Sequence, residues 1–175
     1  MGWWSPPSGL MVREGHELRW DKTRLPLALY VDDAATEWWS YLAACVAEVN
    51  ACVGSKAIMY PEQPLAIIRD AFVGPQPIGV SGAIYVTVDP LVLNTAACCE
   101  PRFDQGTGSI RNALVVLPRK PPLWATAMAL HELGHAMGLD HDHEPGSVMA
   151  PRLSGRESAR FPRPAIDLLR RTYGA

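Results

Sequence analysis

Apolar positions in the first part of the chain predict a strand followed by a helix. Residues 25–31 are continuously apolar, which is typical of a strand covered on both faces. Asp32 and Asp33 follow, and either can cap the start of a helix. From residue 34 to residue 53, apolar side chains recur every three or four positions, and Gly54 can end the helix. We expect this helix to cover a sheet and to do no chemistry.

Four shorter apolar runs follow and predict further strands. Each is bounded by residues that interrupt regular structure, such as proline, glycine and aspartate. The segment 91–109, which contains Gly106 and Gly108, separates the last two runs and is predicted to be a loop. The predicted strands cover residues 57–60, 65–73, 83–88 and 110–117.

Two more helices are predicted in the last third of the chain. The pair Pro121-Pro122 can open the first of them, because proline is tolerated in the first turn of a helix. Gly134 lies in the interior of this helix, where glycine costs about 1 kcal/mol relative to alanine. A close approach by neighbouring backbone would explain that glycine. Residues 164–173 carry apolar side chains at helical spacing and predict a short last helix.

Composition restricts the class of protein. The chain has 175 residues and a net charge of −2, which fits one globular domain, and we expect a monomer. We expect no nucleic-acid partner, because there is no basic excess, and no membrane partner, because no apolar run approaches a membrane span. The opening MGWWSPPSGLMVREG lacks the features of a signal peptide. The compartment is therefore unknown: the chain is cytoplasmic, released non-classically, or the trimmed form of a secreted protein.

The four cysteines give no clear disulfide framework. Cys45 and Cys52 lie seven residues apart on the predicted helix, about 10.5 Å along its axis, which is too far for a mutual disulfide. Both fall on its apolar stripe and are interpreted as buried free thiols. Cys98 and Cys99 lie in the predicted loop, and a pairing between helix and loop stays open. The CxxC spacing of a cysteine zinc site is absent.

The strongest chemical signal is an HExxHxxGxxH pattern. His131 and His135 are four residues apart, so on a helix both imidazoles face the same way. Glu132 lies one step round that helix, near enough to hold a water at a metal ion. Gly138 can adopt a positive φ and end the helix, so that the chain turns back and brings in His141. Three protein nitrogens and one open position are the layout of a catalytic zinc site.

Alternatives to this interpretation remain for individual residues. A chance match to the whole pattern is rarer than about one in ten thousand at ordinary residue frequencies. His143 could compete with His141 as the third ligand, although the spacing favours His141. Asp142 is interpreted as a group that supports a ligand or fixes the turn, not as a ligand itself. Met149 could belong to the core, but its place soon after the metal-binding pattern favours a turn.

The pattern HELGHAMGLDH, followed by SVMAP at 147–151, resembles the metzincin metallopeptidases and, within that clan, most of all the matrixins. RWDKTRLPLALYV and AIDLLRRTYG resemble the first and last segments of matrixin catalytic domains. The resemblance implies an α+β fold: a twisted, mostly parallel five-stranded sheet with an antiparallel edge strand, a backing helix, a zinc-site helix, a Met-turn and a C-terminal helix. It also implies an N-terminal arm, 1–19, and a single catalytic domain, 20–175, with an upper part, 20–138, and a lower part, 139–175.

The resemblance also assigns roles to individual residues. It makes Glu132 the general base and Met149 the hydrophobic floor beneath the metal. It further suggests that the strand 83–88 is the edge strand that binds an extended substrate. The implied ligands of a single zinc ion are His131, His135 and His141.

The chain departs from the matrixins in several places. Asp142 follows the third ligand, where matrixins usually have serine. The second, structural zinc of animal matrixins looks absent, because His16 and His143 are the only spare histidines. Calcium has no support from the sequence, because the segment 91–109 lacks the expected pattern.

The sequence therefore predicts a zinc-dependent endopeptidase acting on extended protein or peptide substrates, with Glu132 as general base. One alternative is a non-catalytic binding or assembly module stabilised by the metal, against which the intact Glu132 argues. Another is a narrow-specificity aminopeptidase of the same clan. Mapping the cleavage products would separate an aminopeptidase from an endopeptidase, because an aminopeptidase releases single residues from amino termini.

Overall fold

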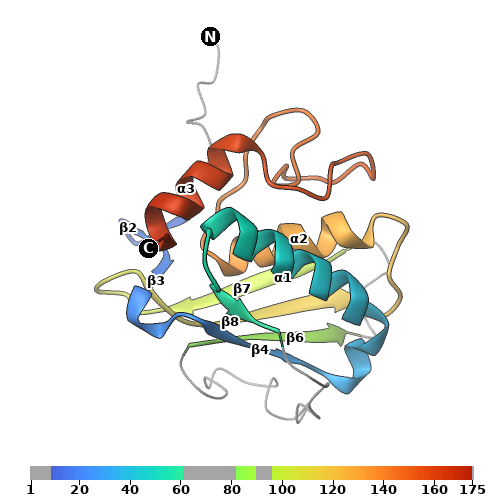
Figure 1. The fold of residues 1–175 in the computed structure, drawn as a ribbon, viewed down its shortest axis with the longest axis horizontal. Coiled ribbons are helices and arrows are strands. Elements are labelled where there is room, and N and C mark those ends of the chain that lie inside the picture. Colours follow the sequence, from blue (N-terminus) through green and yellow to red (C-terminus); the bar gives the residue numbers. More distant parts are fainter. Residues whose placement is uncertain (1–8, 61–81, 90–95, 175) are drawn as a thin grey trace.

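The computed structural model describes residues 9–60, 82–89 and 96–174, which form an α+β fold (Figure 1). Two helices of the fold cover one face of a mostly parallel sheet. These are α1, Trp39–Val53, and α2, Ala125–Ala136. The third helix, α3, Arg163–Tyr173, packs against α1. No helix within the described ranges is long and apolar enough to cross a membrane.

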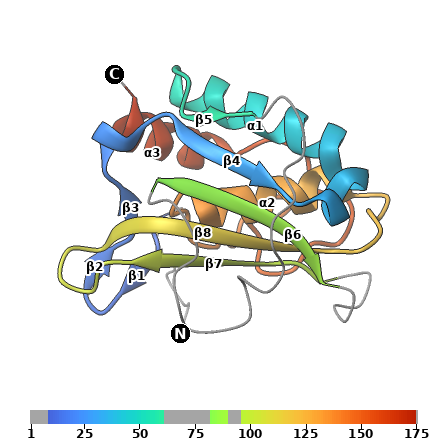
Figure 2. The ribbon, with the colours of Figure 1, turned by 90° about the horizontal axis from the view of Figure 1, so that it is seen from below.

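The sheet contains six strands within the described residues, in the order β3-β8-β6-β4-β5, with β7 also paired to β8 (Figure 2). All neighbouring strands are parallel except β7, which runs antiparallel to β8. The mostly parallel sheet with an antiparallel strand is thus confirmed. The strands are β3, Arg19–Trp20; β4, Leu27–Val31; β5, Ile58–Met59; β6, Ala83–Asp89; β7, Cys98–Phe103; and β8, Ser109–Pro118.

The predicted number of strands and the predicted edge strand are both wrong for the described residues. Two strands, β3 and β7, were not predicted, while the predicted strand 65–73 lies outside the described residues. The segment 83–88 is not an edge strand, because β6 pairs with β4 on one side and with β8 on the other. Its continuous apolar character is typical of such an internal strand. The antiparallel strand is instead β7. The sequence did not predict this strand because it contains Pro101, and proline in a sheet is confined to edges and bulges.

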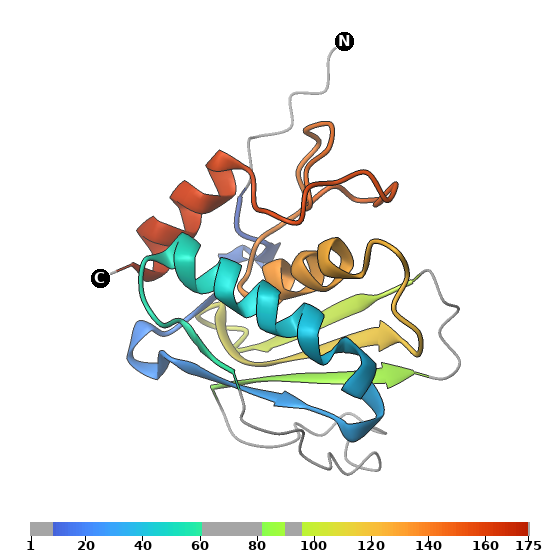
Figure 3. The same cartoon turned by 45° about the vertical axis from the view of Figure 1, so that its right-hand side comes forward.

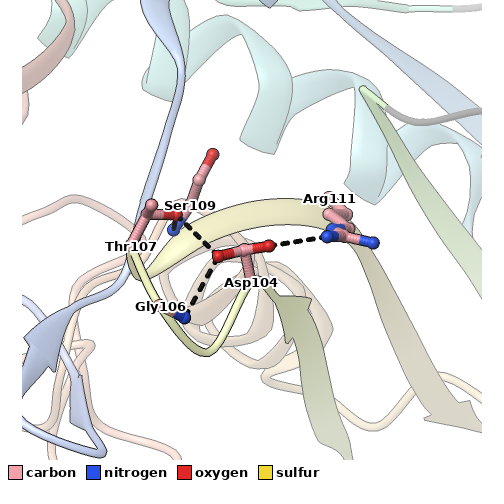
Figure 4. A network of polar contacts seen from close by, with 5 residues as sticks. All are labelled: Asp104, Gly106, Thr107, Ser109 and Arg111. Carbon is pink, nitrogen blue, oxygen red and sulfur yellow. Dashed lines mark hydrogen bonds and ion pairs between the residues drawn. The ribbon is translucent and has the colours of Figure 1, made fainter.

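A polar network holds the hairpin that joins β7 to β8 (Figure 4). The Asp104 carboxylate accepts hydrogen bonds from the Gly106 N–H and the Thr107 hydroxyl, both at 3.1 Å. It also pairs with the Arg111 guanidinium at 2.6 Å. An aspartate that bonds to the backbone two residues on is a common way to close a turn. The polar and glycine residues of 104–108 thus form a tight connection between two strands, not a long loop.

Helices α1 and α2 begin later than the sequence predicts, whereas α3 begins one residue earlier. Six residues of 3-10 helix, η2, Asp33–Trp38, precede α1, and the Asp32 carboxylate caps them by accepting the Ala34 N–H. Gly54 ends α1 with φ 82°, as expected. Pro121 and Pro122 do not open α2; they form a turn before it, in which the Pro122 carbonyl accepts the Ala125 N–H. A further short 3-10 helix, η1, Lys22–Arg24, leads into β4.

The described part of the predicted N-terminal arm contains regular structure. The strands β1, Val12–Arg13, and β2, His16–Glu17, pair antiparallel, and β3 then joins the main sheet. Before them, Leu10 forms an antiparallel bridge with Leu139, just after the end of α2. The division between an arm and a catalytic domain at residues 19 and 20 stays a prediction.

Candidate metal centre

Three polar side chains of helix α2 are buried. His131, Glu132 and His135 are each at most 9 % exposed. The two histidines lie one helical turn apart, with ring centroids 4.6 Å apart. α2 ends at Ala136, and Gly138 then adopts φ 90°, as predicted. A side chain at that position would meet the Leu18 carbonyl, so both the turn and the close packing require glycine.

The turn after α2 brings a third histidine to the first two. The Nε2 atom of His135 lies 3.0 Å from Nε2 of His131 and 3.1 Å from Nε2 of His141. These three side chains are the one group of metal-binding residues found in the described part of the chain. His143, the alternative third ligand, is exposed and lies outside this group.

Backbone carbonyls fix which nitrogen of each buried histidine faces the others. Nδ1 of His131 lies 2.7 Å from the Val148 carbonyl oxygen, and Nδ1 of His135 lies 2.8 Å from that of Leu139. A carbonyl can only accept, so each Nδ1 carries the proton and each Nε2 presents a lone pair. Two lone pairs 3.0 Å apart repel unless a cation lies between them.

The geometry fits a zinc ion. Zinc bonds to histidine nitrogen at about 2.0–2.1 Å in tetrahedral sites, which places the nitrogens about 3.3 Å apart. The observed separations of 3.0 and 3.1 Å are close to that value. Imidazole nitrogens without thiolates are a donor set that suits zinc, and the carbonyl bond to the far nitrogen is the usual support for such ligands.

Burial also sets the charge state of the side chains in the centre. Desolvation lowers the pKa of His131, and desolvation together with the charge of His131 lowers the pKa of His135 to about 4. Both imidazoles are therefore neutral near pH 7, as metal ligation requires. Desolvation raises the pKa of Glu132 to about 8. A nearby cation would act in the opposite direction on this carboxyl group.

Met149 packs directly against the ligand-bearing turn of α2. A Cβ atom added to Gly134 would lie 2.5 Å from the Met149 sulfur and 3.1 Å from the Phe161 ring. The glycine is thus explained by side chains, not by neighbouring backbone as predicted. Met149 is fully buried beneath the residue that precedes His135.

Asp142 fixes the turn that contains Met149. Its carboxylate accepts a hydrogen bond from the Ser147 hydroxyl at 2.7 Å, and its N–H donates to the Met149 carbonyl at 3.0 Å. The Ser147 oxygen in turn accepts the Met149 N–H. This network also holds Val148, whose carbonyl accepts from His131. Asp142 therefore acts on the turn, which is one of the two roles the sequence left open.

A pocket of about 350 Å³ opens beside His131 and Glu132. Its walls come from three segments: the residues just before β7, the first part of α2 with Trp124, and the chain after Met149. Sequence reasoning missed Trp124, which lines this pocket and lies close to Gly155, and the role of Ser147 in the turn. A large aromatic residue just before the helix was the available signal for the pocket. The remaining lining residues are Ala96, Ala97, Met128, Ala150, Pro151, Arg152 and Leu153.

Comparison with known proteins places the likeness mainly in this part of the chain. Residues 119–173 match the family model of the matrixins. Matrix metalloproteinase-16 of Homo sapiens is 43 % identical over 49 residues, which cover 27 % of this chain and 8 % of that protein. Matrix metalloproteinase-15 of Homo sapiens is 41 % identical over 49 residues, covering 27 % of this chain and 7 % of that protein. The matched region thus spans less than a tenth of these relatives.

A solved structure extends the likeness to the fold. The archaemetzincin of Methanopyrus kandleri superposes with a TM-score of 0.53, covering 83 % of this chain and 94 % of that one. The two sequences are 17 % identical, so this similarity concerns the fold alone.

Proposed function

We propose that this chain, whose segment 119–173 matches the matrixin family model and whose fold is similar to that of an archaemetzincin, is a zinc-dependent endopeptidase that cuts extended protein segments. The observation that carries the proposal is the convergence of three histidine nitrogens beside Glu132 at an open pocket. His131, His135 and His141 would hold the zinc ion, and Glu132 is free for acid–base chemistry. Met149 and Asp142 would support the ligands from below.

The chemistry follows from the zinc ion and one carboxylate. A bound zinc ion supplies a strong electrophile, which lowers the pKa of water toward about 7 and polarises a peptide carbonyl. Glu132 would accept a proton from the attacking water and pass it to the nitrogen of the leaving amine. Burial raises the pKa of Glu132, so its carboxylate binds a proton more tightly than an exposed one would, which supports its role as the group that takes the proton from water.

Strand β7 is the proposed docking edge for the substrate backbone. It pairs with β8 on one side, and no described strand pairs with its other side. An extended peptide can add to such an edge through backbone hydrogen bonds. β7 also contacts α2, so a peptide on this edge would pass close to the metal centre. The pocket between Trp124 and Leu153 would then take the side chain that follows the scissile bond.

Zinc-loaded protein and an unfolded protein substrate test this proposal directly. The wild type is compared with Glu132→Gln, which keeps the shape of the side chain, and with Glu37→Gln, which changes an exposed glutamate outside the centre. Mass spectrometry maps the products. We expect internal cuts from the wild type and Glu37→Gln, and none from Glu132→Gln or after chelation.

The other outcomes separate the competing functions. Release of single residues from amino termini would contradict the endopeptidase and indicate an aminopeptidase. Zinc bound at one ion per chain, with equal and negligible cleavage by wild type and Glu132→Gln, would contradict catalysis and favour a metal-stabilised binding module.

A further inference from the structure

The segment that delivers His141 lies against residues 9–11, far away in the sequence. The Met11 N–H donates to the Gly138 carbonyl at 2.8 Å, and the Asp140 N–H donates to the Gly9 carbonyl at 2.9 Å. Between these two bonds, Leu10 and Leu139 form an antiparallel bridge. Two short segments are thus paired on both sides of Leu139, and the next residue but one is the third histidine.

This pairing directs the remaining carbonyl of the segment toward the metal centre. At an antiparallel bridge of this kind, the hydrogen bonds come from the residues on either side of the bridged pair, and the N–H and C=O of the bridged residue itself point away from the partner segment. Gly138 and Asp140 use their groups toward residues 9–11, so the Leu139 carbonyl faces the other way. There it accepts the hydrogen bond from Nδ1 of His135 at 2.8 Å. The pairing therefore bears on two histidines: His135 through Leu139, and His141 through the chain itself.

Residues 9–11 are themselves held firmly. Leu10 and Met11 are buried, at 8 % and 6 % exposure. The Leu18 N–H donates to the Met11 carbonyl at 2.7 Å, which closes the base of the β1–β2 hairpin. Leu18 also lies against Gly138 so closely that any side chain there would meet its carbonyl. The segment 138–140 is thus enclosed by the N-terminal residues on one side and by α2 on the other.

We propose that residues 9–11 are positioning residues for the metal: their pairing with 138–140 sets the zinc affinity by fixing His141 and the Leu139 carbonyl. The inference rests on the proposed zinc site but adds a determinant outside it. It predicts that zinc binding weakens when the pairing is lost, even though all three histidines and Glu132 remain. Displacing or cutting the chain before Val12 would then lower the activity of the domain.

Proline substitutions test the pairing in the full chain. Met11→Pro removes the N–H that Gly138 accepts, and Met11→Ala keeps this N–H but also removes the buried side chain. Val12→Pro controls for proline itself. Glu14 and Gly15 form a two-residue turn with φ 51° and 82°, so Arg13 and His16 form the hydrogen-bonded pair. The Val12 N–H therefore points away from β2.

A second pair of variants tests the same contact from the segment 138–140. Asp140→Pro removes the N–H that Gly9 accepts, whereas Asp140→Ala keeps it. Both substitutions remove the carboxylate that accepts the His141 N–H, so their difference isolates the backbone bond. Asp140 is exposed, which limits the effect of either change on packing.

The readouts are the zinc dissociation constant, from competition with a chromogenic chelator, and the unfolding temperature of the metal-free protein. We expect Met11→Pro to bind zinc about 10- to 100-fold more weakly than Met11→Ala, as for loss of other groups that support ligands. Asp140→Pro should be weakened similarly relative to Asp140→Ala. Val12→Pro should bind zinc like the wild type.

Two results would overturn the inference. If Met11→Pro and Asp140→Pro lower the unfolding temperature but bind zinc as tightly as their alanine partners, residues 9–11 stabilise the fold only. Peptidase activity is not needed for that conclusion, so it leaves the proposed function standing. If the wild type binds no zinc, the inference and the proposed function both fail.

Discussion

Helices α1 and α2 cover the same face of the sheet, yet they bury different residues (Figure 3). α1 buries six of its fifteen residues, all of them apolar or cysteine. α2 buries eleven of its twelve, including two histidines and a glutamate. The chain after α2 folds back over it, with Met149 and Phe161 against Gly134. α1 therefore keeps a solvent-exposed side, and α2 does not.

This difference in burial identifies α2 as the candidate functional helix. Burying an imidazole or a carboxylate costs free energy unless the group is paired, so a helix that only covers a sheet leaves such groups outside. In α2, His131, Glu132 and His135 are buried despite this cost. Backbone carbonyls of the neighbouring turns hydrogen-bond to the two histidines. Buried polar groups aimed at one point thus distinguish a helix that performs chemistry from one that provides packing.

The sharpest test of this contrast removes the carboxylate from α2. Glu132→Gln should lower the rate of peptide hydrolysis about 10²- to 10⁴-fold, the usual contribution of a general base. Zinc affinity should change little, because Glu132 is not among the three nitrogen donors. Steady-state kinetics and chelator competition measure the two quantities, with Glu37→Gln, just before α1, as control. A fall in zinc affinity to match the fall in rate would contradict the assignment.

The opposite test removes packing from α1. Leu42 is fully buried, and Leu42→Ala should lower the free energy of unfolding by about 2–5 kcal/mol because it leaves a cavity. Activity per folded molecule should stay the same, since α1 contributes no group to the metal centre. Urea unfolding and active-site titration with an inhibitor check this. Selective loss of activity with unchanged stability would break the distinction between the two helices.

Glycines on the two helices sharpen the comparison. Gly134→Ala should destabilise the protein by about 1–3 kcal/mol through overpacking against Met149, despite a gain of about 1 kcal/mol in helix propensity. It should also weaken zinc binding, because Met149 and the His135 turn must move apart. Gly54→Ala, at the end of α1, should cost about 1 kcal/mol through its φ of 82° and leave zinc binding unchanged. Equal zinc affinities in the two variants would refute the role of Met149.

The turn that packs over α2 can be destabilised by a substitution at Ser147. Ser147→Ala removes the donor to the Asp142 carboxylate and the acceptor of the Met149 N–H, for an expected loss of about 1–3 kcal/mol. Thermal unfolding measures this loss. Ser40→Ala, on the exposed side of α1, is the matched control and should stay within about 0.5 kcal/mol of the wild type. A similar effect at both serines would show that the turn is not specially supported.

The smallest effect on stability is expected in the β7–β8 hairpin, which belongs to neither helix. Hydrogen bonds from Arg111 and Thr107 lower the pKa of the exposed Asp104 below its ordinary value of 3.8. Its contribution to stability is therefore present above pH 3.8 and is lost as the pH falls through the lowered pKa. Asp104→Asn should remove this contribution, so that stability falls slightly at neutral pH and approaches that of the wild type near pH 2, while zinc affinity remains close to wild type. Unfolding curves between about pH 2 and pH 5 check this.

The fold was predictable where local patterns carry it. The apolar run at 25–31, the stripe of α1 and the C-terminal helix are each encoded within one segment, and the structure confirms them with shifted boundaries. Strand β7 was missed, because Pro101 and the polar residues around it carry no strand pattern. The position of β6 in the sheet was wrong for a different reason. Strand order depends on which segments pair, and nothing within one strand specifies its partners.

The candidate site followed the same division. The spacing of His131 and His135 required only helical geometry, and the positive φ of Gly138 only a turn. The buried free thiols of Cys45 and Cys52 were likewise predictable from the apolar stripe of α1, and the structure confirms them. Trp124 at the pocket was not predictable, because the Gly155 that it lies against is in a separate segment. Ser147 bonds within its own turn, to Asp142 and Met149, but a serine hydroxyl can bond in many ways and its sequence position does not select one.

The sequence by itself determined the candidate site of this protein. Three histidines, a glutamate and a glycine at fixed spacing are enough to predict a metal site, because helix and turn geometry act over a few residues. The tertiary structure alone decided the surroundings: β7 as the outer strand, Met149 against Gly134, and residues 9–11 beside the segment of His141. These contacts join residues far apart in the chain, and only packing of the complete domain selects among the many pairings that each segment allows.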